Sequence, residues 1–110
     1  MIYNRSTFVE ILEILRENLS HHIEISESRG LETNPVTQMV DFKCKKNKKT
    51  GIIVVGENNN KIVVEVIVDN HEDVIKGTPL IEMHKINIEL LNGLVAWFEK
   101  YNETRSPLLV

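Results

Sequence analysis

The sequence is poor in the residues that mark specialised protein classes, with one cysteine and one tryptophan among its 110 residues. A single cysteine excludes an internal disulfide, which favours a reducing compartment such as the cytoplasm. No apolar run is long enough to span a membrane, and the segment MIYNRSTFVE lacks the apolar core of a signal peptide. We therefore expect no membrane partner and a single cytoplasmic domain over residues 1–110.

The charge balance excludes strongly biased classes of protein. There are 13 basic and 16 acidic residues, for a formal net charge of -3. This value is close to average and implies neither a basic nucleic-acid binder nor an acidic mimic of DNA. Any charge that matters for function must therefore be local.

Motifs of the common enzyme classes are also missing. The sequence has no nucleophile elbow, phosphate-binding loop, dinucleotide fingerprint, zinc pattern or kinase signature. We expect no cofactor and no catalytic residues. An enzyme is the less favoured alternative, and its site would have to be assembled by folding from Asp41, His71, Glu82 or His84.

Two segments contain metal-ligand residue types without the spacing of a metal site. His21 and His22 are adjacent, and Asp69, His71 and Asp73 do not match a calcium loop. We interpret them as surface residues and expect no metal.

The first amphipathic helix is expected over about residues 7–19, with Thr7 and Glu10 as a capping box. Its apolar stripe consists of Phe8, Ile11, Leu12, Leu15 and Leu19. The opposite side carries Glu10, Glu13 and Glu17. We interpret this acidic side as a solvated face and not as a contact for a basic partner.

The last helix is expected over about residues 88–101, with Asn87 as its N-cap. Its apolar arc contains Leu90, Leu91, Leu94, Val95, Trp97, Phe98 and Tyr101. Gly93 lies on the polar side, where it weakens the helix without ending it. The short apolar segment 80–83 fits either an edge strand or one helical turn.

Between the helices, the sequence predicts an antiparallel sheet. The runs on either side of Asn58 and Asn59 are rich in Val and Ile and form a hairpin, and residues 36–46 add a strand through the NKKTG turn. Ile23 and Ile25 suggest one more short strand. The expected fold class is α+β, with an antiparallel sheet of four to five strands flanked by an N-terminal and a C-terminal amphipathic helix.

The alternation of side chains divides this sheet into two faces. With turns at Asn58–Asn59 and Lys48–Lys49, Val55 pairs with Ile62 and Cys44 with Ile53. One side, which we call face A, is apolar and carries Val40, Phe42, Cys44, Ile53, Val55, Ile62, Val64, Val66 and Val68. The other side, face B, is mixed and carries Met39, Asp41, Lys43, Lys45, Ile52, Val54, Val63, Glu65, Ile67 and Asp69.

Two binding functions follow from this arrangement. The favoured one is a non-catalytic module that binds another protein, or a second copy of itself, through Ile52, Val54, Val63, Glu65 and Ile67. Its class includes homodimers and inhibitory, immunity-like or chaperone-like partners. It requires both helices to pack on face A, since helices on both faces would bury face B in the monomer.

The alternative is contact with a nucleic-acid backbone through the lysine-rich hairpin tip. The phosphate-binding candidates are Lys43, Lys45, Lys46, Lys48 and Lys49. The tip has no arginine and only Phe42 as a nearby aromatic, so a solvated tip that discourages edge pairing is favoured. Cys44 lies within this segment, and the register turns its thiol into the core.

Overall fold

The computed structural model describes residues 4–68, 80–83 and 88–103. In chain order the elements are α1 (Arg5–Leu19), β1 (Ile23–Ile25), β2 (Arg29–Gly30), β3 (Gln38–Cys44), β4 (Thr50–Asn58), β5 (Lys61–Val68), β6 (Leu80–Met83) and α2 (Ile88–Glu103). The strands form one antiparallel sheet in the order β1-β3-β4-β5-β6, with β2 also paired to β3. The predicted α+β fold is confirmed, and residues 80–83 form a strand.

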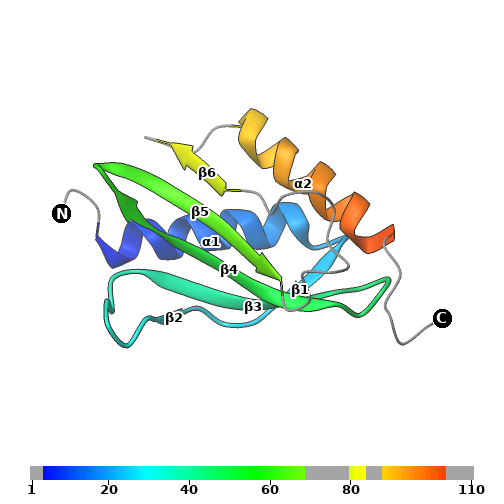
Figure 1. Cartoon of the computed structure of the whole chain (residues 1–110), viewed down its shortest axis with the longest axis horizontal. Coiled ribbons are helices and arrows are strands. Elements are labelled where there is room, and N and C mark those ends of the chain that lie inside the picture. Colours follow the sequence, from blue (N-terminus) through cyan, green and yellow to red (C-terminus); the bar gives the residue numbers. More distant parts are fainter. Residues whose placement is uncertain (1–3, 69–79, 84–87, 104–110) are drawn as a thin grey trace.

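Both helices lie on the same side of the sheet (Figure 1). The buried residues of α1 are Phe8, Ile11, Leu12, Leu15 and Leu19, as their spacing predicted. They share one core cluster with Leu94, Phe98 and Tyr101 of α2 and with all nine face A residues. The Phe42 and Phe98 rings meet edge to face, with their centroids 5.1 Å apart. Face A is therefore the inner face, and the condition set by the sequence for an open face B is met.

The register of the β4–β5 hairpin differs from the prediction by two residues. The turn is formed by Asn59 and Asn60, which have positive φ angles of 51° and 65°. Val55 therefore pairs with Val64, and the predicted pairing with Ile62 was wrong. An even shift keeps each side chain on its own face, so the division into two faces survives.

The β3–β4 register differs from the prediction by four residues, because the turn between these two strands also lies at a different position. Phe42 lies opposite Gly51 and Val40 lies opposite Ile53, so the predicted pairing of Cys44 with Ile53 was wrong. The Cys44 N–H donates to the Lys49 carbonyl at 2.8 Å, and Lys48 has a φ of 65°. The loop between the two strands is thus 45–48, and its centre lies two residues before the turn that we expected at Lys48–Lys49.

The start of α1 also differs from the prediction. Asn4 is the N-cap, and its side-chain oxygen accepts a hydrogen bond from the Thr7 N–H at 3.1 Å. The capping box of Thr7 and Glu10 was therefore wrong, because Asn4 is an equally good acceptor one helical turn earlier. The proposed cap of α2, Asn87, lies outside the described residues, as do Asp69, His71, Asp73 and His84.

Candidate binding surface

Face B presents a continuous apolar patch in the middle of the sheet. Ile52 lies directly opposite Ile67, and Val54 lies between Met39 and Glu65 in the next row. Val63 follows on β5, opposite Gly56. We call Met39, Ile52, Val54, Val63 and Ile67 the central patch.

The central patch is the part of the sheet that the helices leave open. Ile67 is 37 % exposed, and the other four residues of the patch are partly exposed. By contrast, Val64 and Val66 on face A have no exposed surface. Neighbouring residues of one strand therefore face different environments, as alternation predicted.

Charged side chains surround the patch. The Asp41 carboxylate accepts hydrogen bonds from both terminal nitrogens of the Arg29 guanidinium, at 2.8 and 3.1 Å. The side chains of Lys43 and Glu65 are exposed and make no hydrogen bond or ion pair with any described residue. An apolar centre with a charged rim is the usual composition of a protein interface. Sequence reasoning missed Arg29, because a two-residue strand has no detectable periodicity.

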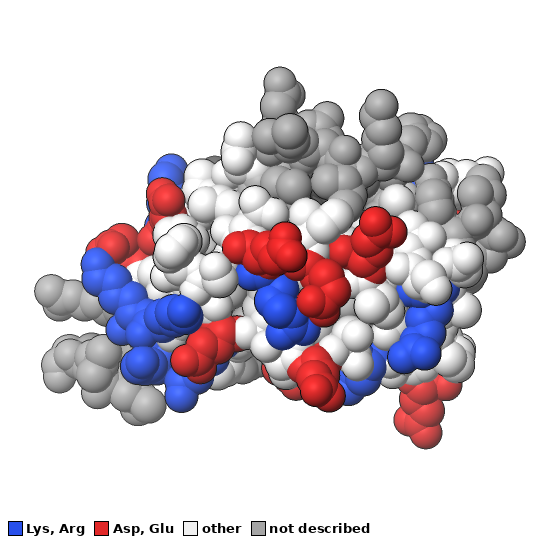
Figure 2. Space-filling model, turned by 180° about the vertical axis from the view of Figure 1, so that it is seen from behind, with Lys and Arg blue, Asp and Glu red and all other residues white. Residues whose placement is uncertain are grey.

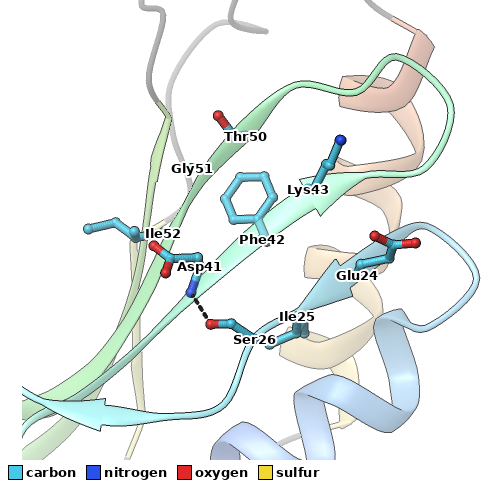
Figure 3. Close-up of a pocket in the computed structure, with 9 residues that line it drawn as sticks. All are labelled: Glu24, Ile25, Ser26, Asp41, Phe42, Lys43, Thr50, Gly51 and Ile52. Atoms are coloured by element: carbon cyan, nitrogen blue, oxygen red, sulfur yellow. Dashed lines mark hydrogen bonds between the residues drawn. The ribbon is translucent and has the colours of Figure 1, made fainter.

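A hollow of about 560 Å³ opens on face B beside the patch, where β1, β3 and β4 meet (Figure 3). Its wall includes Glu24, Lys43, Asp41 and Ile52. On one side Ser26 bridges a break in the edge strand: its hydroxyl oxygen accepts a hydrogen bond from the Asp41 N–H at 2.9 Å. The Ser26 hydroxyl also lies 3.3 Å from the Glu27 carbonyl, to which it donates. The hydroxyl is thus used to complete the sheet.

The edge of the sheet at β1 is closed by α1. The Arg16 guanidinium donates to the carbonyls of Ile25 at 2.6 Å and Ser26 at 2.8 Å. These are edge carbonyls, which an added strand would otherwise use. A partner strand could pair with this edge only by displacing Arg16. In this part of the sheet the surface open to a partner is therefore face B and not the strand edge.

The lysine-rich loop is solvated only in part, whereas we expected a solvated tip: Lys45, Lys46 and Lys48 are exposed, but Asn47 and Lys49 are buried. Its main chain and side chains pack against the end of α2, where Asn102 accepts from the Lys46 N–H at 3.1 Å and Asn47 donates to the Tyr101 carbonyl at 2.5 Å. The Lys46 ammonium pairs with Glu103. Donors and positive charge suit a helix C-terminus, which carries unpaired carbonyls and partial negative charge.

Lys49 is also largely buried. It is 9 % exposed, and its ammonium lies 5.2 Å from the centre of the Tyr101 ring. Of the five lysines considered as phosphate ligands, Lys43, Lys45 and Lys48 are exposed and belong neither to this contact nor to the Glu103 pair. The loop therefore offers less free positive charge than its sequence suggested.

The described members of the other candidate sites lie apart. Asp41 on β3 and Glu82 on β6 are separated by two strands. His22 lies 3.6 Å from Glu99, and His21 is exposed. Within residues 4–68, 80–83 and 88–103, no three His, Cys, Asp or Glu side chains are grouped to hold a metal ion. Neither described helix has the length and apolar character needed to cross a membrane.

Cys44 is fully buried on face A, as the sequence predicted. Burial raises the pKa of its thiol to about 11, although the nearby Lys49 charge acts in the opposite direction. The thiol is therefore protonated at neutral pH and is a structural core group.

The helix side of the molecule is strongly charged. Figure 2 shows acidic residues across the middle of this side, over α1, and basic residues gathered at its left edge. The exposed residues of α1 include Glu10, Glu13 and Glu17, and Arg16 pairs with Glu13 at 3.4 Å. Charge of this density surrounded by water fits a solvated face better than a protein contact.

Comparison of the chain with models of known families, with curated proteins and with solved structures gave no match. Any statement about function therefore depends on the surface itself.

Proposed function

We propose that the protein is a small non-catalytic binding module whose partner docks on face B. The partner is a second copy or a different protein that is neutralised, inhibited or chaperoned. The observation that carries the proposal is the central patch, which is at least partly exposed in the middle of a sheet face that neither helix covers. Contiguous apolar surface with a polar rim favours association with another protein.

The arrangement of buried and exposed residues supports this proposal. Every described apolar residue of the core cluster belongs to face A, to the helices or to β1. The central patch contributes nothing to that cluster, so its apolar residues are not explained by folding of the monomer. A partner that covers them would remove apolar surface from water, which is the main driving force of association.

The test is the double variant Val63→Lys with Ile67→Lys, compared with the parent in capture of proteins from extracts of the source cells. Two ammonium groups in the central patch should abolish capture of any specific partner. The matched control is Asn92→Lys with Ala96→Lys, which adds the same charge at two exposed positions of α2. Capture that survives in the first variant and fails in the control would place the interface on the helix side and contradict the proposal.

Binding of a nucleic-acid backbone by the lysine loop is the weaker candidate. Lys46 and Lys49 are engaged with Glu103 and Tyr101, which leaves few lysines for phosphates. A complex held by Lys43, Lys45 and Lys48 would weaken steeply with salt, by a slope of about 0.9 per phosphate contact. Absence of DNA or RNA binding at low salt would eliminate this candidate.

A further inference from the structure

We infer that the partner of face B is a second copy of this chain, related by a two-fold axis that passes over Ile52. The inference rests on the proposed function and adds the identity of the partner and the contact geometry. Closed two-fold dimers are the commonest assemblies of soluble proteins, and they require a surface that is complementary to itself. The charges on face B have this property.

Lys43 and Glu65 lie on opposite sides of Ile52. Lys43 is paired with Thr50, two residues before Ile52 on β4, and lies on the β3 side. Glu65 is paired with Val54, two residues after Ile52, and lies on the β5 side. Ile52 is therefore the midpoint between a positive and a negative side chain.

The two charges are too far apart to pair within one copy. Two strand spacings of about 4.8 Å and four residues of about 3.3 Å separate their Cα atoms by roughly 16 Å. In the dimer the face B surfaces of the two copies are stacked on each other. The two-fold axis runs between the two sheets and parallel to them, passes over Ile52, and is perpendicular to the line from Lys43 to Glu65. Rotation about this axis exchanges the positions of the two charges. Each Lys43 then faces the Glu65 of the other copy, and the two Ile52 side chains meet at the axis.

Two acidic residues lie beside Ile52 and Lys43 on the face. Asp41, the cross-strand neighbour of Ile52, is already neutralised by its two contacts with Arg29. Glu24 lies opposite Lys43 on β1, but the two form no ion pair. Lys43 and Glu65 are thus two unpaired charges beside Ile52 on face B.

The face also has the size that a dimer needs. Five strands of three to nine residues, at about 4.8 Å spacing and about 3.3 Å per residue, give a projected area of roughly 500 Å². Side-chain relief makes the accessible area larger, close to the roughly 800 Å² per partner of a standard interface. The hollow beside Ile52 provides concave surface for side chains of the second copy.

The experiment uses charge reversal, followed by sedimentation equilibrium over a range of protein concentrations. Lys43→Glu and Glu65→Lys should each weaken dimerisation by roughly tenfold or more, because each places two like-charged pairs in the interface. An equimolar mixture of the two variants should form a heterodimer, since all its cross-contacts are then between opposite charges. The double variant Lys43→Glu with Glu65→Lys should recover the parent dimer.

The control Glu10→Lys reverses a charge on the exposed side of α1 and should leave the dimer unchanged. Circular dichroism of each variant confirms that it is folded. A parent protein that stays monomeric up to about 500 µM would overturn the second-copy inference. Face B would still be the binding surface if the Val63→Lys, Ile67→Lys variant lost capture of a different protein. A parent dimer that is insensitive to both reversals would also overturn the inference.

Discussion

The ring of Phe42 packs against Gly51 on the neighbouring strand, in the space that a side chain at position 51 would occupy. A Cβ atom there would lie 2.6 Å from two ring carbons of Phe42 and would clash with the Ile67 carbonyl oxygen. Phe42 in turn contacts Phe98 of α2, so this position links the sheet to the helix layer.

Gly51→Ala should therefore destabilise the protein by about 2 kcal/mol or more, because backbone and ring must both move. Urea unfolding followed by circular dichroism measures the change. Gly93→Ala is the matched control, since nothing lies within 4 Å of the added methyl group and the site is helical. It should stabilise the protein by about 0.5–1 kcal/mol. Equal effects of the two substitutions would contradict the register of β3 and β4.

Val64→Asp should prevent folding, whereas Val63→Asp should leave a folded monomer. Val64 is fully buried on face A, and an unpaired carboxylate there costs several kcal/mol, comparable to the whole stability of a small domain. Val63 is partly exposed on face B. Thermal melts of the two variants should differ sharply. Similar damage from both would show that face B is buried within the monomer.

Asn102→Ala should destabilise the protein by about 2–4 kcal/mol, because it removes three contacts of a buried side chain. The amide of Asn102 donates to the carbonyls of His22 at 3.1 Å and Phe98 at 2.9 Å, and its oxygen accepts from Lys46. Asn92→Ala, at an exposed position of the same helix, should have little effect. Chemical denaturation of both variants provides the comparison. An Asn102→Ala variant with the stability of the parent would refute the docking of the loop on α2.

Stability should fall with pH between about 9 and 11 through Cys44. The folded-state pKa is raised from 9.0 to about 11, so the unfolded thiol loses its proton first and alkaline pH favours the unfolded chain. The contribution of the protonated Cys44 thiol to the free energy of unfolding is fully present below pH 9. It declines by up to about 3 kcal/mol as the pH rises to 11. Urea titrations at several pH values should show this decline in the parent and a smaller one in Cys44→Ala. Parallel curves would mean that the thiol is not buried.

The sequence predicted the two faces of the sheet correctly but not the pairing of its strands. Alternation of Val and Ile with polar residues is a local signal, and even shifts of register preserve it. The tract Asn58–Asn60 offers turn positions one residue apart, and either accepts positive φ. The packing of Phe42 over Gly51 depends on tertiary contacts that no local pattern contains.

The candidate surface was predictable in part. Alternation placed all five residues of the central patch on face B. Four of them were predicted as contact residues, and Met39 was not. The docking of the lysine loop was not predictable, because Lys46 and Asn102 are 56 residues apart and no periodicity connects them. Gln38 was also missed, although alternation places it on face A with Val40 and Phe42: it is fully buried, and its amide donates to the Pro35 carbonyl at 2.8 Å.

The most direct test of the central claim is methyl cross-saturation by NMR. Copies carrying labelled Ile and Val methyl groups on a deuterated background are mixed with an excess of unlabelled protein, or with a captured partner. We predict that saturation of the unlabelled molecules reduces the signals of Ile52, Val54, Val63 and Ile67 and leaves those of Ile53, Val55, Val64 and Val66 unchanged. Loss of intensity confined to methyl groups of α1, such as Val9 and Ile14, would show that the binding surface is on the helix side and would contradict the proposed role of face B.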